Sequence, residues 1–115
     1  MLRKKIIIVT GAAGLIGKSL IKTFLEYNAI VIATDINQLA LDKLREHKDF
    51  INYKPSLYCL NLNITDKASI LKVIQTVKNK YGKIDAIINN AYPKNKAFGK
   101  KLEDVNYYDF SENLS

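Results

Sequence analysis

The chain is poor in the residues that build disulfide scaffolds, metal centres and membrane spans. Its 115 residues include one cysteine, Cys59, and one histidine, His47. An internal disulfide is therefore excluded, and no cluster of histidines and cysteines marks a metal site. No apolar stretch approaches the ~20 residues that cross a bilayer. We expect one cytoplasmic domain over residues 1–115, with no metal and no membrane contact, in which Cys59 is a buried apolar residue.

Acidic residues and arginine are also scarce. Lysine and arginine total 18 against 11 aspartates and glutamates, a formal charge of +7. Such an excess raises the hypothesis of a nucleic-acid partner. All of the basic residues except Arg3 and Arg45 are lysines spread along the chain, so few side chains could make bidentate contacts with bases. The composition favours a solvated basic surface and no nucleic-acid partner.

Only five glycines are present, but three of them form one motif. Gly11, Gly14 and Gly17 follow the apolar run at 6–9 and open a helical pattern. Glycines there let the backbone turn tightly and approach a pyrophosphate, toward which the N–H groups of the next helix point. A secretory signal is the alternative for this basic and apolar start, but Thr10 and the glycines interrupt the apolar run. The motif predicts a phosphate-binding loop.

A carboxylate follows the second apolar run. Asp35 stands 24 residues after Gly11, at the end of the run at 29–34. At the tip of a second strand it could accept both ribose hydroxyls of an adenosine. The glycine spacing, Gly-x-x-Gly-x-x-Gly, differs from the common Gly-x-Gly-x-x-Gly, so the loop alone is weakly specific. Asp35 strengthens the prediction of a dinucleotide site.

Apolar runs alternate with helical patterns. The runs at 5–10, 30–35, 57–61 and 84–89 predict buried parallel strands. Between them lie helical core stripes made of Ile16, Leu20, Ile21, Phe24 and Leu25, then Leu41 and Leu44, then Ile70, Ile74, Val77 and Tyr81. Asn37, Thr65 or Asp66, and Gly82 suit helix caps. The alternation predicts an α/β fold with a Rossmann-type doubly wound parallel sheet in the order 3-2-1-4, which binds a nucleotide at the carboxyl ends of strands 1 and 4.

The segment after residue 92 and the single histidine carry less structural information. Residues 93–104 are polar and basic and predict a loop, after which Asn106 suits the N-cap of another helix. His47 lies near the end of the second helical pattern, where a cation would suit the helix dipole.

Four motifs in order resemble those of the short-chain dehydrogenase/reductase family. They are Thr-Gly-x-x-Gly-x-x-Gly at 10–17, Asp35, Leu-Asn-Ile-Thr-Asp at 62–66 and Asn-Asn-Ala at 89–91, and the match covers about residues 5–114. The resemblance implies an NAD-dependent oxidoreductase that transfers hydride between nicotinamide and an alcohol or carbonyl. The segment at 88–96 is similar to variants associated with flagellin modification and surface-sugar biosynthesis, which implies a sugar nucleotide as the small-molecule substrate.

The resemblance also assigns roles to individual residues. Those on the pyrophosphate and nicotinamide side would be Gly11, Gly14, Leu15, Ile16 and Gly17; those at the adenine ribose, Asp35 and Ile36; those at the adenine, Asn63 and Ile64; and those under the nicotinamide ribose, Asn90, Ala91 and Tyr92. Asn89 would brace the sheet. The family usually has Asp in place of Asn63 and Gly in place of Tyr92. The first departure would make the hydrogen bond to the adenine amino group a neutral one, and the second would reshape the rim of the site.

The family's catalytic residues are not among these motifs. A tyrosine four residues before a lysine on a helix would have its pKa lowered by the ammonium. Only Tyr92 and Lys96 have this spacing, and Pro93 between them argues against a helix. The family's Ser, Tyr and Lys would follow Ser115, so we assign no catalytic residue.

The chain is accordingly expected to be the incomplete, cofactor-binding half of the family fold. We expect no turnover from it alone, association through the open edge of its fourth strand, and a homo-oligomer at full length. Two alternatives remain: a non-catalytic nucleotide-binding module or truncated product, and a sugar-nucleotide epimerase or dehydratase.

Overall fold

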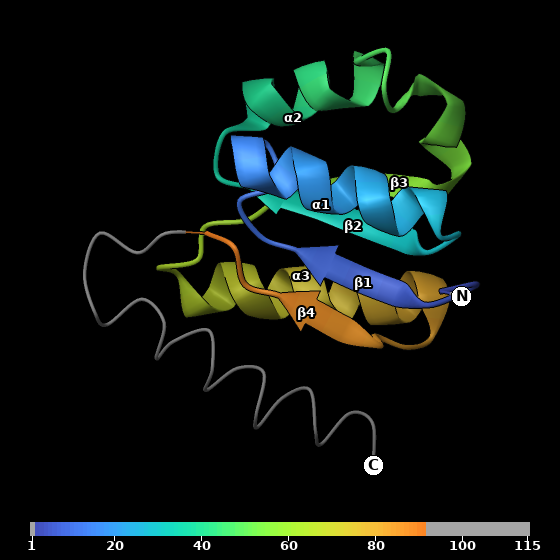
Figure 1. Ribbon diagram of the computed structural model, residues 1–115. Helices are drawn as coiled ribbons and strands as arrows, with labels where there is room; N and C mark the ends of the chain where they lie inside the picture. The colour runs from blue at the N-terminus through green and yellow to red at the C-terminus, as the bar shows by residue number, and fades with distance from the viewer. Residues whose placement is uncertain (1, 92–115) are drawn as a thin grey trace.

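Strands and helices alternate along the chain in a computed structural model, which describes residues 2–91 (Figure 1). The elements are β1 (Ile6–Val9), α1 (Leu15–Glu26), β2 (Ile30–Asp35), α2 (Gln38–Glu46), the 3-10 helix η1 (Ile51–Ser56), β3 (Leu57–Asn61), α3 (Lys67–Tyr81) and β4 (Ala86–Ile88). The four predicted strands and three predicted helices are therefore confirmed, whereas η1 was not predicted. Tyr92, the 93–104 loop and the helix expected after Asn106 lie outside the described residues.

The strands form one parallel sheet in the order β3-β2-β1-β4, as predicted. In its register, Ile8 pairs with Ile32 on one side and with Ile87 on the other. All four strands run in the same direction, so their carboxyl ends meet at one edge of the sheet. The loops that follow these strands surround the candidate site.

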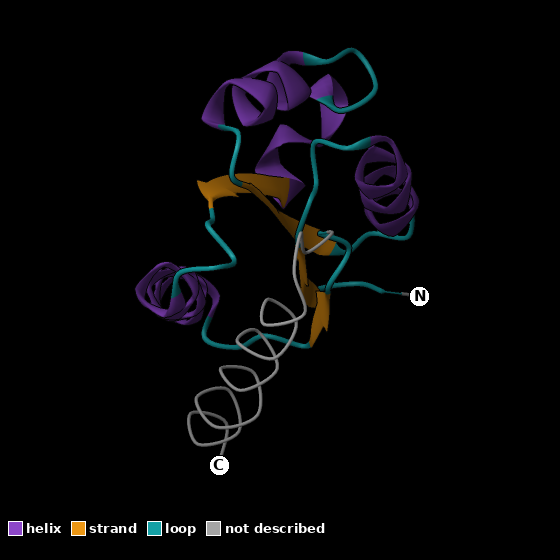
Figure 2. Cartoon of the chain, turned by 90° about the vertical axis from the view of Figure 1, so that its left-hand side faces the viewer, coloured by secondary structure: helices purple, strands orange, loops and turns teal. Residues whose placement is uncertain are grey.

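Helices cover both faces of the sheet (Figure 2). Successive strand side chains point to opposite faces, and β1 divides accordingly between two cores. Ile7 and Val9 pack with residues of α1 and α2, whereas Ile6 and Ile8 pack with residues of α3. This burial on both faces explains why the strands are near-continuous apolar runs.

The helix ends match the local sequence signals. The side chain of Asn37 accepts a hydrogen bond from the Ala40 N–H at the start of α2, and Asp66 accepts one from the Ala68 N–H at the start of α3. Gly82 ends α3 in the left-handed conformation, with φ 81°. Of the two predicted candidates for the N-cap of α3, the structure selects Asp66 over Thr65.

One predicted core residue of α1 is exposed. Ile21 and Leu25 are buried, but Ile16 retains 53% of its accessible surface. The expectation that Ile16 belongs to the core was wrong, because it stands in the first turn of α1 and lines the cavity at the carboxyl edge of the sheet instead. Its other predicted role, at the cofactor site, is compatible with this position.

The structure also bears on the expected role of Cys59 and on the question of membrane-spanning helices. Cys59 on β3 is half-buried, not fully buried as expected, and burial raises the pKa of its thiol to about 11, although Arg45 opposes the shift. It is therefore mostly protonated at neutral pH and a weak nucleophile. None of the helices within residues 2–91 has the length and apolar character that crossing a bilayer needs.

Candidate functional site

A cavity of about 820 Å³ opens at the carboxyl edge of the sheet. The loops after all four strands contribute to its lining, which consists of Thr10, Gly11, Gly14, Leu15, Ile16, Thr34, Asp35, Ile36, Leu62, Asn63, Ile64, Thr65, Asn90 and Ala91. The structure thus brings together every sequence-predicted site residue except Gly17 and Tyr92. Gly17 is buried behind the loop, and Tyr92 lies outside the described residues.

The glycine loop passes close to the chain that follows β4. Gly11 has φ +63°, and a β-carbon added to it would lie 3.0 Å from the Ala91 α-carbon. A β-carbon added at Gly17 would overlap the Gly11 carbonyl oxygen and lie 2.8 Å from the Ala12 α-carbon. The packing of the protein's own backbone therefore requires a glycine at both positions, and the approach of a phosphate to this loop stays a prediction.

Gly14 differs from its two neighbours in the motif. A β-carbon there would meet only the Gly11 carbonyl oxygen, at an ordinary 3.4 Å. Nothing in the described fold requires a glycine at this position, which lines the cavity and forms the N-cap of α1.

The N-terminus of α1 presents free hydrogen-bond donors. Gly14 supplies no side-chain cap, and the first turn of α1 holds no acidic residue. The first N–H groups of a helix have no partner within it, and those of α2 and α3 are served by Asn37 and Asp66. At α1 the corresponding donors and the positive end of the helix dipole remain for an anion in the cavity.

Asp35 connects the end of β2 to the glycine loop. Its Oδ2 accepts a hydrogen bond from the Ala13 N–H at 3.0 Å, and its Oδ1 accepts one from the Asn37 N–H at 3.0 Å. Each carboxylate oxygen can accept a further hydrogen bond. The half-buried carboxylate is therefore held in a fixed position and still able to accept two hydroxyl donors from a ligand.

Thr10 is a site residue that the sequence analysis missed. Thr10 is 1% exposed, and its hydroxyl accepts hydrogen bonds from the Asn90 N–H at 2.9 Å and the Ala91 N–H at 3.1 Å. The same oxygen lies 3.2 Å from Asn89 Oδ1, to which it can donate its proton. This contact agrees with the expected bracing role of Asn89. A hydroxyl residue directly before the first glycine was the available signal.

Asn63 is anchored at the start of the loop before α3. Its Oδ1 accepts hydrogen bonds from the Thr65 N–H at 3.0 Å and the Thr65 Oγ1 at 2.7 Å. Its own N–H donates to Ser69 Oγ at 3.0 Å. The side chain is therefore fixed where Asn63 and Ile64 line the cavity.

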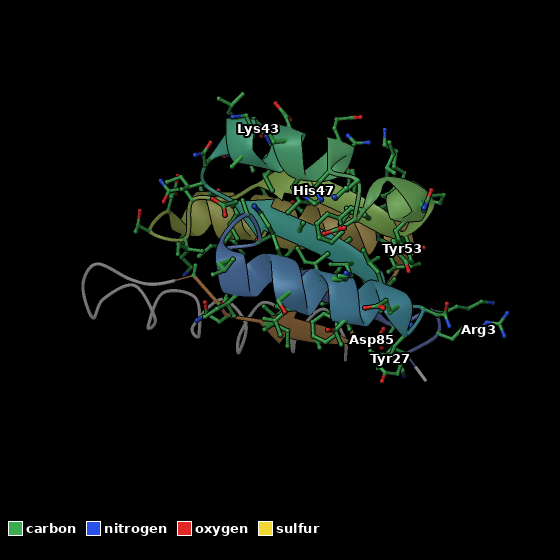
Figure 3. All side chains as sticks on the ribbon, turned by 45° about the horizontal axis from the view of Figure 1, so that its top comes forward. Arg3, Tyr27, Lys43, His47, Tyr53 and Asp85 are labelled. Carbon is green, nitrogen blue, oxygen red and sulfur yellow. The ribbon has the colours of Figure 1, made fainter. Side chains whose placement is uncertain are left out.

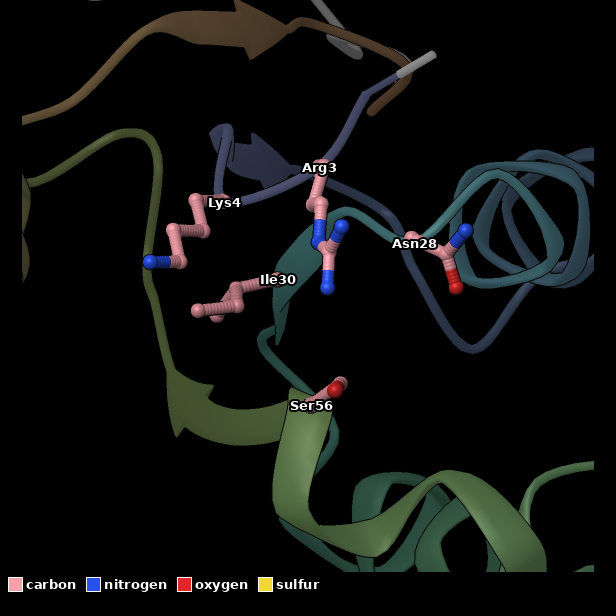
Figure 4. A pocket seen from close by; sticks show the side chains of 5 residues that line it. All are labelled: Arg3, Lys4, Asn28, Ile30 and Ser56. Carbon is pink, nitrogen blue, oxygen red and sulfur yellow. The ribbon is translucent and has the colours of Figure 1, made fainter.

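The opposite edge of the sheet carries basic groups away from this cavity. Figure 3 shows Arg3, Tyr27 and Asp85 at the edge where the strands begin. A second hollow of about 570 Å³ lies there, lined by Arg3, Lys4, Asn28, Ile30 and Ser56 (Figure 4). The N-terminal cations therefore do not contribute to the site beside the glycine loop.

Metal ligands do not gather in the described part of the chain. Within residues 2–91, no three or more His, Cys, Asp or Glu side chains are grouped so as to hold an ion. His47 forms the C-cap of α2, and its Nδ1 accepts a hydrogen bond from the Asp49 N–H at 3.1 Å.

Known proteins match the chain in sequence and in fold. The family model described as short chain dehydrogenase matches residues 5–111. Post-translational flagellin modification protein A of Campylobacter coli is 40% identical over 111 residues, which are 96% of this chain and 41% of that protein. An NAD-dependent glycerol dehydrogenase of Listeria innocua is 35% identical over 113 residues, 96% of this chain and 41% of that protein. The crystal structure of a hydroxysteroid dehydrogenase from Escherichia coli matches with TM-score 0.70 and 30% identity over 80% of this chain and 38% of that one. The chain thus spans less than half the length of each.

Proposed function

The chain belongs to the short-chain dehydrogenase family, and we propose that it is the NAD-binding part of an oxidoreductase that transfers hydride between nicotinamide and an alcohol or carbonyl. Members of the family use NAD or NADP. The observation that carries the proposal is that one cavity joins the uncapped N-terminus of α1 to the carboxylate of Asp35. These are the two groups that a dinucleotide's pyrophosphate and ribose require.

Each part of the cavity has a task in this proposal. The first N–H groups of α1 hold the pyrophosphate, and the absence of a side chain at Gly14 permits its approach. Asp35 accepts hydrogen bonds from the hydroxyls of the adenosine ribose. Thr10 fixes the backbone of Asn90 and Ala91 on the nicotinamide side. The bound cofactor supplies the group that gains or loses the hydride.

The substrate is a narrower proposal. The relative from Campylobacter coli is named for flagellin modification, and this name supports a sugar nucleotide used in building surface glycans. Assembly into a homo-oligomer at full length belongs to the same proposal.

We predict that the chain prefers NAD to NADP. The 2′-phosphate of NADP would face the Asp35 carboxylate, and two unit charges ~4 Å apart at an effective dielectric of 20 interact by about 4 kcal/mol. Even a screened quarter of this energy gives several-fold selection. Calorimetric titration of both cofactors measures the ratio, and tighter binding of NADP would contradict the assignment of Asp35.

An added arginine tests the same point without disturbing Asp35. Ile36 is 64% exposed and lines the cavity, whereas Leu39 is 65% exposed on α2 and does not line it. Ile36→Arg should raise the affinity for NADP, because the guanidinium would lie beside the 2′-phosphate. Leu39→Arg adds the same charge and serves as the matched control.

A further inference from the structure

We infer that Asn63 selects the purine of the dinucleotide by donating a hydrogen bond, so that the site binds a 6-oxopurine at least as well as adenine. The inference rests on the proposed function, in which the base lies against Asn63 and Ile64. It concerns a feature that the family resemblance alone does not predict, because an asparagine that accepts from the adenine amino group was the expectation.

The orientation of the Asn63 amide follows from its neighbours. The backbone N–H of Thr65 can only donate, so the Asn63 atom that lies 3.0 Å from it must be the oxygen. The same oxygen accepts from the Thr65 hydroxyl at 2.7 Å. A carbonyl oxygen has two lone pairs, and both are used here.

The amide nitrogen of Asn63 is the group left for a ligand. Within residues 2–91, Asn63 Nδ2 donates no hydrogen bond, whereas the nearby Asn61 Nδ2 donates to the Ile36 carbonyl oxygen at 2.9 Å. Asn63 lines the cavity and is half-buried. The base end of the cavity therefore offers a donor.

In the base orientation that the family resemblance implies, Asn63 Nδ2 faces the group on C6, and a donor there distinguishes purines by that group. Adenine carries an amino group there, which donates, and hypoxanthine carries an oxygen, which accepts. A donor facing a donor leaves both groups unpaired, and an unpaired buried polar group weakens binding. An aspartate would reverse the selection, because one oxygen would still accept from Thr65 and the other would accept from the adenine amino group.

The test compares two dinucleotides that differ only at C6 of the purine. Calorimetry measures the binding of NAD and of nicotinamide hypoxanthine dinucleotide to the chain, to Asn63→Asp and to Asn79→Asp. Asn79 is exposed on α3 and does not line the cavity, so its variant repeats the chemical change elsewhere. We expect the unaltered chain and Asn79→Asp to bind the hypoxanthine form at least as tightly as NAD. Asn63→Asp should shift the ratio toward NAD by about tenfold or more, as expected for a hydrogen bond to a charged group.

The outcomes separate this inference from the proposed function. If the unaltered chain binds NAD more tightly than the hypoxanthine form, or if Asn63→Asp leaves the ratio unchanged, the inference is overturned and the NAD site stands. If neither dinucleotide binds, both are overturned.

Discussion

Asp35 stabilises the glycine loop in addition to its proposed role in binding the ribose. Its two carboxylate oxygens accept the N–H groups of Ala13, in the glycine loop, and of Asn37, at the cap of α2. Replacing it with alanine would leave both donors unpaired and release the loop from β2. A loss of affinity in Asp35→Ala would therefore combine a missing ribose contact with a displaced loop, which is why the arginine variants are the sharper test.

Gly14→Ser should change stability and binding in opposite directions. A serine at the N-cap of α1 has the required space and an extended backbone, with φ −77° and ψ 171°. Its hydroxyl would accept from the first N–H groups of α1, which should raise the free energy of unfolding by about a few tenths of a kcal/mol. The same contact would occupy donors needed by the pyrophosphate, so NAD affinity should fall by about tenfold, the effect of ~1.4 kcal/mol. Urea unfolding and calorimetry measure the two effects.

Gly17→Ala serves as the contrast. Its β-carbon would overlap the loop backbone, so this variant should lose about 1–3 kcal/mol of stability. Unchanged NAD affinity in a folded Gly14→Ser variant would contradict the assignment of the α1 N-terminus as the pyrophosphate site.

The sequence allowed most of the cavity lining to be predicted, but not the direction of its hydrogen bonds. Glycines, a carboxylate after β2 and the Asn-Asn-Ala segment are local signals, so their positions followed from strand ends. The role of Thr10 and the orientation of the Asn63 amide depend on contacts between segments or on turn geometry. The tight packing around Gly17 likewise arises only when α1 folds back against its own loop.

Elements were predictable where their signals were local. The N-caps Asn37 and Asp66 and the C-terminal Gly82 mark α2 and α3 because capping involves residues within one turn. The 3-10 helix η1 carries no periodic pattern long enough to indicate it. The exposure of Ile16 was equally hidden, because helical periodicity does not reveal where a helix extends past the edge of the sheet.

The junction of β4 and β1 should respond to pH. Asp85 Oδ2 accepts from the Ile6 N–H at 2.7 Å and from Lys83 Nζ at 3.0 Å. Burial by itself would raise the pKa of Asp85, but these two partners and the charge of Lys5 outweigh it and hold the pKa below its usual 3.8. A lowered folded-state pKa stabilises the fold above the unfolded value, and this stability is lost as pH falls through the folded-state pKa.

Asp85→Asn should therefore lower the free energy of unfolding at pH 7 by about 1 kcal/mol, which is less than the ~1.5–3 kcal/mol of a hydrogen bond to a charged group because Asp85 is partly exposed. The difference from the unaltered chain should shrink below about pH 4, as the native carboxyl becomes protonated. Urea unfolding at pH 7 and at successively lower pH measures it. An equal difference at every pH would show that hydrogen-bond geometry, rather than charge, accounts for the effect.

The arrangement of the whole sheet followed from chain connectivity. Parallel strands joined by helices cross over in the right-handed sense. The first three strands are added toward one side of the sheet, and the chain then returns to the other side, which places β4 beside β1. The two cores then form on opposite faces, and the cavity arises where the strand order reverses. The formal charge of +7 did not predict the site, because Arg3 and Lys4 line the hollow at the other edge.

Because the cavity joins loops from all four strands, a ligand bound there should stabilise the whole sheet. A ligand that binds only the folded state at 100 times its Kd adds about 2.7 kcal/mol to the free energy of unfolding. For a domain of this size, that energy corresponds to a rise in Tm on the order of 10 °C. Thermal unfolding with increasing NAD should therefore show a progressive rise in Tm for the unaltered chain, whereas Gly14→Ser should begin at an equal or higher Tm and rise less. An equal rise in both proteins would indicate that NAD binds away from the N-terminus of α1.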